Sequence, residues 1–167
     1  MKVGILTVSD KGARGEREDR SGPALREMVE AAGGEVARAK IVPDERTDIS
    51  AVLVAWSDEG LDLVLTTGGT GFSPRDWTPE ATKQVLEREA PGLAEAMRRA
   101  GAEKTPTAML SRAVAGLRKA TLIVNLPGSE RAARESLEAI LPALPHAIEV
   151  LKGAASECAR NRPGGGR

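Results

Sequence analysis

The stretch LDLVLTTGGTGFSPRDWTPEAT, residues 61–82, decides how this chain folds. It opens with the apolar run 61–67, which is short and typical of a strand buried on both faces of a sheet. The run ends in TTGGTG, residues 66–71, where glycines allow sharp backbone turns. Thr78 and Pro79 then predict the start of a helix, because proline is favoured in a helix's first turn. The stretch therefore predicts a strand, a glycine turn and a helix in succession.

Strand and helix patterns alternate on both sides of this stretch. Further strands are predicted at 3–9, 35–43 and 121–128, and the second of these alternates in polarity, as expected of a more exposed strand. Helices are predicted at 23–32, from Asp48 to Gly60, from Thr78, at 91–101 and from Ser129, with Pro142 and Pro145 bending or dividing the last one. Asp48, Thr78 and Ser129 are the predicted N-caps.

This alternation predicts an α/β fold with a mainly parallel sheet, because strands joined by helices form right-handed crossover units. The charged segment 10–22 is predicted to be a surface loop. With no repeat or linker, the 167 residues predict one domain, 1–155, followed by a flexible C-terminal tail, 156–167.

The composition argues against several classes of protein. Lysine and arginine (24) balance aspartate and glutamate (24), and aromatic residues are scarce, which does not favour a nucleic-acid-binding protein. No apolar run approaches the roughly 20 residues of a membrane span, and the first residues do not match a signal peptide. The single cysteine, Cys158, fits a reducing compartment. We therefore expect a cytoplasmic protein with no nucleic-acid or membrane partner.

Unusual residues stand where three predicted strands end. They are Ser9-Asp10, the glycine turn at 66–71, and the segment NLPGS at 125–129. Ligands of open α/β sheets bind beyond the carboxyl ends of the strands, and glycine turns and helix N-termini present amide groups to anions. Hydroxyl donors come from Thr66, Thr67, Thr70 and Ser129. The pattern matches neither a P-loop nor a dinucleotide fingerprint, so it predicts a phosphate site of another kind or, alternatively, ordinary turns.

Two aspartates accompany these turns. Asp44 follows the strand predicted at 35–43, and Asp76 follows the glycine turn. Carboxylates beside phosphates usually hold Mg²⁺, which takes one or two carboxylates together with phosphate oxygens. The alternative is structural: Asp76 would cap the helix at 78, and Asp44 would form a turn. Arg75 likewise predicts either a phosphate contact or a surface ion pair.

Several of these motifs resemble those of a known family. TTGGTGFSPRDWTPEAT (66–82) is similar to the signature of the molybdopterin-binding fold, and NLPGS (125–129) to its second motif. VSD at 8–10, VPDE at 42–45 and PTAMLSRA at 106–113 fit the same family in order and spacing. The resemblance covers residues 3–152 and is nearest to the molybdopterin adenylyltransferases, which are similar to the gephyrin-type G domain.

The resemblance implies a three-layer αβα fold with a mostly parallel sheet, one antiparallel edge strand and helices on both faces. It implies a homotrimer that transfers an adenylyl group from Mg-ATP to molybdopterin, giving adenylylated molybdopterin and pyrophosphate for molybdenum cofactor biosynthesis. Molybdopterin and ATP would be the substrates, Mg²⁺ the cofactor, and a downstream molybdate-insertion enzyme a partner.

The family's residues can be transferred to matching positions. Asp44 and Asp76 are the implied catalytic acids and metal ligands, with positioning roles and not proton transfer. The residues implied to bind the substrates are Ser9, Asp10, Thr67, Gly68, Gly69, Thr70, Gly71, Ser111, Pro127, Gly128 and Ser129. Glu130 departs from the proline found in many relatives. Asp19, Ser21 and Gly22 also fit a family-like pattern, whereas Ser111-Arg112 could equally lie in an ordinary helix.

Two other functions stay open from the sequence. One is a non-catalytic molybdopterin-binding trimer of the same fold. The other is a different nucleotide-acting enzyme, like the competence-damage-type domains. The presence of both Asp44 and Asp76 favours catalysis over the first alternative.

Overall fold

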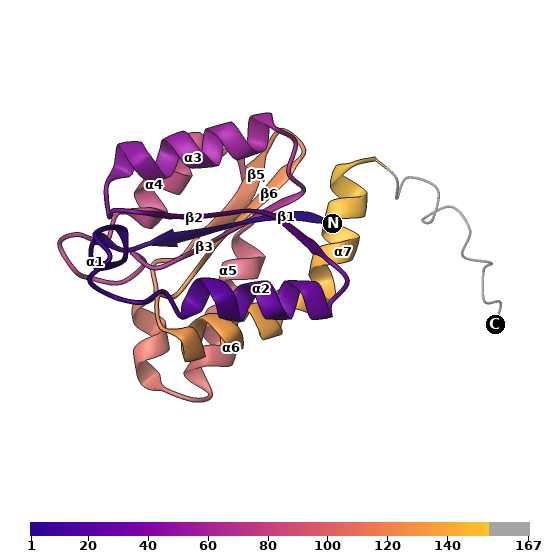
Figure 1. Ribbon diagram of the computed structural model, residues 1–167. Coiled ribbons are helices and arrows are strands. Elements are labelled where there is room, and N and C mark those ends of the chain that lie inside the picture. Colours follow the sequence, from indigo (N-terminus) through magenta and orange to yellow (C-terminus); the bar gives the residue numbers. More distant parts are fainter. Residues whose placement is uncertain (154–167) are drawn as a thin grey trace.

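The structure is a computed structural model that describes residues 1–153, so the predicted domain boundary at 155 and the tail at 156–167 lie outside the described residues. Within the described part the sheet has six strands in the order β2-β1-β3-β6-β5-β4 (Figure 1). The strands are β1 (Lys2–Val8), β2 (Glu35–Val42), β3 (Leu63–Thr67), β4 (Arg88–Glu89), β5 (Ala115–Arg118) and β6 (Thr121–Leu126).

The predicted parallel sheet is confirmed for four of the six strands, which are neighbours in the sheet. β2, β1, β3 and β6 pair in parallel, whereas β5 pairs antiparallel with both β6 and β4. The implied antiparallel strand is therefore β5. It is not the edge strand, because the two-residue β4 lies beyond it at the edge of the sheet. β4 and β5 were not predicted individually, because segments of two and four residues carry too little periodicity to recognise.

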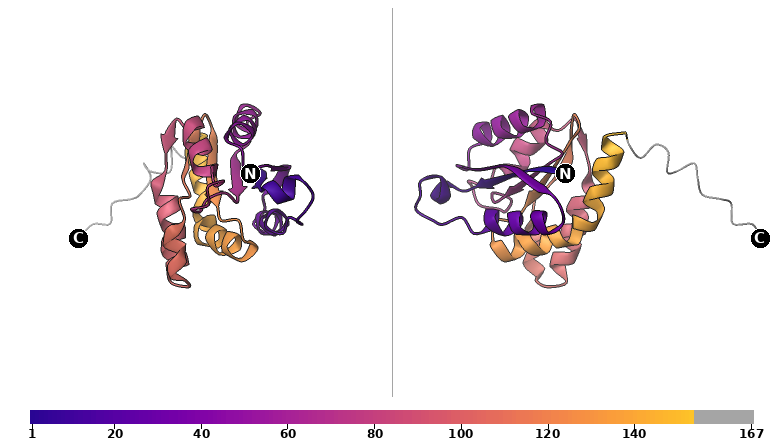
Figure 2. Two further views of the ribbon diagram at one scale, coloured as in Figure 1. Left: turned by 90° about the vertical axis from the view of Figure 1, so that its left-hand side faces the viewer. Right: turned by 45° about the vertical axis from the view of Figure 1, so that its right-hand side comes forward.

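Helices cover both faces of the sheet and give three layers, which Figure 2 shows from two further sides. The helices are α1 (Asp10–Ala13), α2 (Ser21–Ala31), α3 (Arg46–Asp58), α4 (Thr78–Val85), α5 (Pro91–Ala102), α6 (Glu130–Ile140) and α7 (Leu144–Leu151), with 3₁₀ turns η1 (Pro106–Leu110) and η2 (Leu141–Ala143). One core cluster joins α3 and α4 to the sheet, and the other joins α2, α5, α6 and α7. None of the helices among residues 1–153 is long and apolar enough to cross a membrane.

The central strands are continuous apolar runs because both of their faces are buried. In β1, Val3 and Ile5 pack in the cluster with α2 and α6, and Leu6 packs in the cluster with α3 and α4. Burial of each such side chain contributes roughly 1.5–3 kcal/mol to folding. β2 is an edge strand with mostly exposed side chains, as its alternating sequence predicted.

Several predicted helix boundaries need correction. Segment 10–22 is not only a loop, because α1 forms within it. Asp48 lies in the first turn of α3, and Glu45 occupies its N-cap position. Thr78 does not cap α4, because its hydroxyl donates to the Gly68 carbonyl at 2.8 Å. The prolines 142 and 145 do divide the last helix, since η2 separates α6 from α7.

Candidate functional site

The carboxyl ends of β1, β3 and β6 lie side by side at one edge of the sheet. Thr67 of β3 is in register with Thr7 of β1 and with Leu126 of β6. The Gly68 amide then donates to the Leu126 carbonyl at 3.2 Å, directly after the strands end. The structure therefore brings together the three segments that the sequence singled out.

Glycine is required in these turns because main chain packs directly against main chain. Gly68 has φ 101° and Gly69 has φ 65°, in the region that favours glycine. A Cβ atom on Gly68 would lie 2.2 Å from the Val8 carbonyl oxygen, and one on Gly128 would lie 3.1 Å from the Gly68 Cα. The turn after β3 is thus fitted between the ends of the two neighbouring strands.

Hydroxyl and amide groups beneath the turn hold it in place. The Thr67 hydroxyl donates to the Pro127 carbonyl at 2.7 Å. The buried Asn125 amide donates to the hydroxyls of Thr66 and Thr82, at 3.0 and 2.9 Å. The hydroxyls of Thr66 and Thr67, which the sequence suggested as ligand donors, are therefore used internally and support the turn.

Two adjoining cavities open at this edge. The larger, of about 760 Å³, is lined by the predicted residues Ser9, Asp44, Thr67, Gly68 and Ser129. The smaller, of about 410 Å³, is lined by the predicted residues Thr70, Gly71, Ser111 and Pro127. Three further predicted residues, Gly69, Asp76 and Gly128, line both. Asp10 lines neither of these two cavities.

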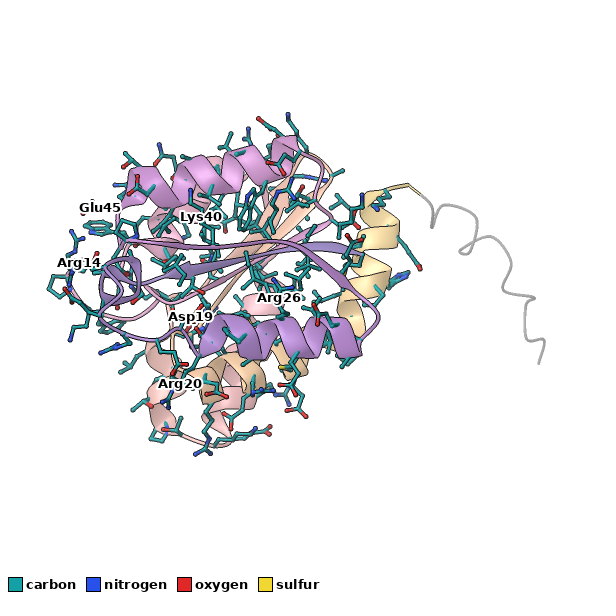
Figure 3. All side chains as sticks on the ribbon, viewed as in Figure 1. Arg14, Asp19, Arg20, Arg26, Lys40 and Glu45 are labelled. Carbon is teal, nitrogen blue, oxygen red and sulfur yellow. The ribbon has the colours of Figure 1, made fainter. Side chains whose placement is uncertain are left out.

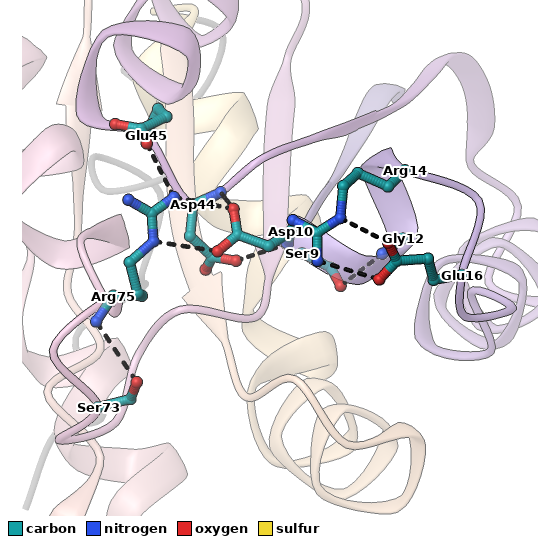
Figure 4. Close-up of polar contacts among 9 residues, drawn as sticks. All are labelled: Ser9, Asp10, Gly12, Arg14, Glu16, Asp44, Glu45, Ser73 and Arg75. Carbon is teal, nitrogen blue, oxygen red and sulfur yellow. Dashed lines mark hydrogen bonds and ion pairs between the residues drawn. The ribbon is translucent and has the colours of Figure 1, made fainter.

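Asp44 and Asp10 hold each other through reciprocal hydrogen bonds (Figure 4). The Asp10 amide donates to Asp44 Oδ2 at 2.7 Å, and the Asp44 amide donates to Asp10 Oδ1 at 3.0 Å. Arg75 donates from Nε and Nη2 to the Asp10 carboxylate at 3.0 and 2.9 Å, and it pairs with Glu45 at 2.8 Å. Arg75 thus ties the loop after the glycine turn to the ends of β1 and β2.

The carboxylates at this edge have shifted pKa values. Burial, together with the negative charges of Asp10 and Asp76, raises the pKa of Asp44, whose residue is 9% exposed. The hydrogen bond from Arg75 instead lowers the pKa of Asp10. Asp44 therefore lies in a negative potential that a bound cation would relieve.

The donor set suits Mg²⁺ only together with a phosphate. Among residues 1–153 there is no group of three or more histidine, cysteine, aspartate or glutamate side chains that could hold a metal ion alone. Mg²⁺ characteristically takes one or two carboxylates and completes its shell with water and substrate phosphate oxygens. Asp44 and Asp76, which lie close enough to interact electrostatically, fit this pattern.

Replacing Asp44 with asparagine is expected to stabilise the protein in metal-free buffer, and only at higher pH. The unfolded carboxyl ionises near pH ~3.9, whereas the folded one has a raised pKa, so stability falls as pH rises between the two values. Urea unfolding at several pH values should show equal stability of the two proteins at about pH 3 and a more stable variant at about pH 7. A stability difference that does not change with pH would contradict this account.

Asp76 is held in a turn and does not cap a helix. Its Oδ2 accepts from the Ser73 amide at 3.0 Å, and its own amide donates to the Ser73 carbonyl at 2.9 Å. The N-cap position of α4 is Trp77, so the structural alternative for Asp76 is wrong. The Ser129 hydroxyl does cap α6, accepting from the Ala132 amide at 3.3 Å.

The sequence anticipated only part of one wall of the larger cavity, because it marked Asp19 and Ser21 as fitting a family-like pattern but not their neighbours. Five consecutive residues line this wall, namely Arg17, Glu18, Asp19, Arg20 and Ser21. Figure 3 shows Asp19 and Arg20 at the start of α2. Asp19 accepts hydrogen bonds from the Thr7 hydroxyl (2.7 Å), the Ser21 hydroxyl (3.1 Å) and the Gly22 amide (2.9 Å). The sequence does carry a signal for this arrangement, because Asp19 stands three residues before Gly22, a spacing typical of an aspartate that accepts from the first amides of a helix. The high charge of segment 10–22 instead favoured a surface loop.

Comparisons with known proteins agree with this architecture. A crystal structure of the molybdopterin biosynthesis enzyme MoaB from Thermus thermophilus is 61% identical with a TM-score of 0.87, and the match covers 91% of this chain and 96% of that one. Molybdopterin adenylyltransferase of Helicobacter pylori strain J99 is 44% identical over 92% of this chain and 89% of its own length. Gephyrin of Dictyostelium discoideum is 44% identical over 89% of this chain, which spans only 22% of gephyrin.

A family model covers most of the chain as well. Residues 4–146 match the family described as "Probable molybdopterin binding domain". This match includes all three strand ends and both aspartates of the site. The chain belongs to the molybdopterin-binding domain family.

Proposed function

We propose that this protein is a molybdopterin adenylyltransferase, which transfers the adenylyl group of Mg-ATP to molybdopterin and releases pyrophosphate. The observation that carries the proposal is the pair of cavities that share Gly69, Asp76 and Gly128 as a common wall. A transfer between two phosphorylated substrates needs adjoining binding sites, because the two reacting groups must be held close together. The Helicobacter relative is named a molybdopterin adenylyltransferase, and the match covers 89% of its length, which supports the same reaction for this chain.

The reaction balances without a strong base. An oxygen of molybdopterin's terminal phosphate attacks the α-phosphorus of ATP and forms a new P–O–P bond. The bond between the α-phosphorus and the bridging oxygen to the β-phosphorus breaks, and pyrophosphate leaves with that electron pair. The attacking phosphate is already ionised near neutral pH, so the main barrier is the repulsion between anions.

The protein reduces this repulsion by positioning and by oriented dipoles. Gly69 and Gly71 expose main chain at the wall, and the N-terminus of α6 after Ser129 adds a partial positive charge. Asp44 and Asp76 would hold Mg²⁺, whose charge stabilises the phosphoryl oxygens when it is bound. Both aspartates therefore have positioning roles in this proposal and transfer no proton.

The decisive experiment is a direct assay. The purified protein is incubated with Mg-ATP and molybdopterin, and pyrophosphate and the adenylylated pterin are measured together. We expect both products in equal amounts, and none when Mg²⁺ is removed with a chelator. Pterin binding without either product would instead support a non-catalytic binding protein of this fold.

We further propose that the protein acts in the cytoplasm as a homotrimer that passes its product to a molybdate-insertion enzyme. The family resemblance supports the trimer and the downstream partner, and the single cysteine supports a reducing compartment such as the cytoplasm. Light scattering of the purified protein should give three times the chain mass of 17.5 kDa. A particle of one chain mass at working concentration would exclude the trimer.

A further inference from the structure

Arg112 is bound to the loop that carries Asp76 at several separate points. It lies between η1 and β5, and its main-chain amide donates to the Thr70 carbonyl at 2.9 Å. Its guanidinium Nε donates to the Gly71 carbonyl at 2.7 Å, and Nη2 donates to the Asp76 carbonyl at 2.7 Å. One planar group therefore joins the first and the last residue of the loop 71–76.

The remaining side of the guanidinium is held by Glu80 of α4. Arg112 Nη1 forms an ion pair with Glu80 Oε1, while Glu80 Oε2 is buried with no hydrogen-bond partner among the described residues. Leaving a carboxylate oxygen unsatisfied costs free energy, so the arrangement is not optimal for stability alone. The ion pair does fix the plane of the guanidinium, which sets the direction of its two bonds to the loop.

A second arginine, Arg75, holds the loop from within its own sequence. Its side chain is half exposed and bridges to Asp10 and Glu45. Arg112 is more enclosed, with a side chain 34% exposed. It lines neither of the two cavities at this edge, so within the described structure it acts on the substrates only through the loop.

We propose that Arg112 is a positioning residue for the transfer reaction, which holds Asp76 at the wall between the two cavities by clamping both ends of the loop 71–76. This inference rests on the proposed function for its kinetic consequence, but its structural part does not. A rigid fork is needed, because a lysine ammonium at this position could pair with Glu80 without reaching the carbonyls of Gly71 and Asp76 together.

The test is Arg112→Lys, with Arg118→Lys as the matched control. Arg118 is the last residue of β5 and, like Arg112, contacts both a main-chain carbonyl and a carboxylate. These belong to Val85 and Asp58, and they lie at the end of β5 away from the site. We expect Arg112→Lys to lower kcat about 30- to 100-fold, with KM for both substrates within about twofold, because a displacement of about 1 Å can have an effect of this size. Arg118→Lys should leave kcat unchanged.

Hydrogen exchange gives a readout that needs no activity. The amides of Ser73 and Asp76 are bonded within the loop, so both should exchange at least about tenfold faster in Arg112→Lys, whereas Arg118→Lys should not change them. Unchanged exchange, full kcat in Arg112→Lys, or an equal loss in Arg118→Lys would overturn the proposal. If the wild-type protein transfers no adenylyl group, the proposed function fails, while the exchange experiment still decides whether Arg112 holds the loop.

Discussion

Replacing Asp76 with asparagine is expected to lower the rate of adenylyl transfer about 100- to 1000-fold, the range found when one preorganised electrostatic contact is removed from an active site. Asp76 lies at the wall common to both cavities, where the reacting phosphates would meet. Asparagine can still accept the hydrogen bond from the Ser73 amide, so the turn should keep its shape. The variant loses the negative charge that would bind Mg²⁺. Steady-state pyrophosphate release and thermal unfolding together measure the two effects.

A matched control is available in α3. Asp48→Asn makes the same chemical change at an exposed position in the first turn of that helix. Its transfer rate should equal that of the wild-type protein. If Asp76→Asn also transfers at the wild-type rate, Asp76 is not a catalytic residue. A loss of rate accompanied by a lower unfolding midpoint would show that the turn itself was damaged.

The central layers of the fold could be predicted from sequence because their signals are local. The apolar runs of β1, β3 and β6 are buried on both faces, and a strand of that kind can be recognised without knowing its neighbours. β5 has only four residues, and its place beside β6 follows from a short turn between them and not from its own composition. Prediction from sequence therefore fails for a short strand that forms only because it pairs with a neighbouring strand.

The candidate site divides in the same way. The glycine turn and the two aspartates could be found because glycine and carboxylate chemistry are visible residue by residue. The reciprocal bonds between Asp10 and Asp44 could not, because the two residues are 34 positions apart and meet only through the pairing of Val8 with Val42. The clamp by Arg112 spans 36 positions to Asp76 and likewise depends on the tertiary fold.

Replacing Gly68 with alanine is expected to lower the free energy of unfolding by more than about 3 kcal/mol, with a fall of about 10 °C in the unfolding midpoint. Two costs add at this position. The backbone has φ 101°, which alanine rarely adopts, and the new Cβ would lie 2.2 Å from the Val8 carbonyl oxygen. Main chain cannot move aside as a flexible side chain could, because β1 is held on both sides by β2 and β3. Chemical denaturation at one protein concentration measures the loss.

Gly33→Ala separates the two costs. Gly33 also has a positive φ, of 80°, but no atom lies within 4 Å of the Cβ that alanine would add. Only the backbone cost applies there, and we expect a loss of about 1 kcal/mol. If the two variants were equally destabilised, contact with Val8 would contribute nothing, and the close approach of β1 and the glycine turn could not be the reason for glycine at 68. A much larger loss in Gly68→Ala would instead show that the strand ends pack main chain against main chain, and that this packing fixes the wall where the two cavities meet.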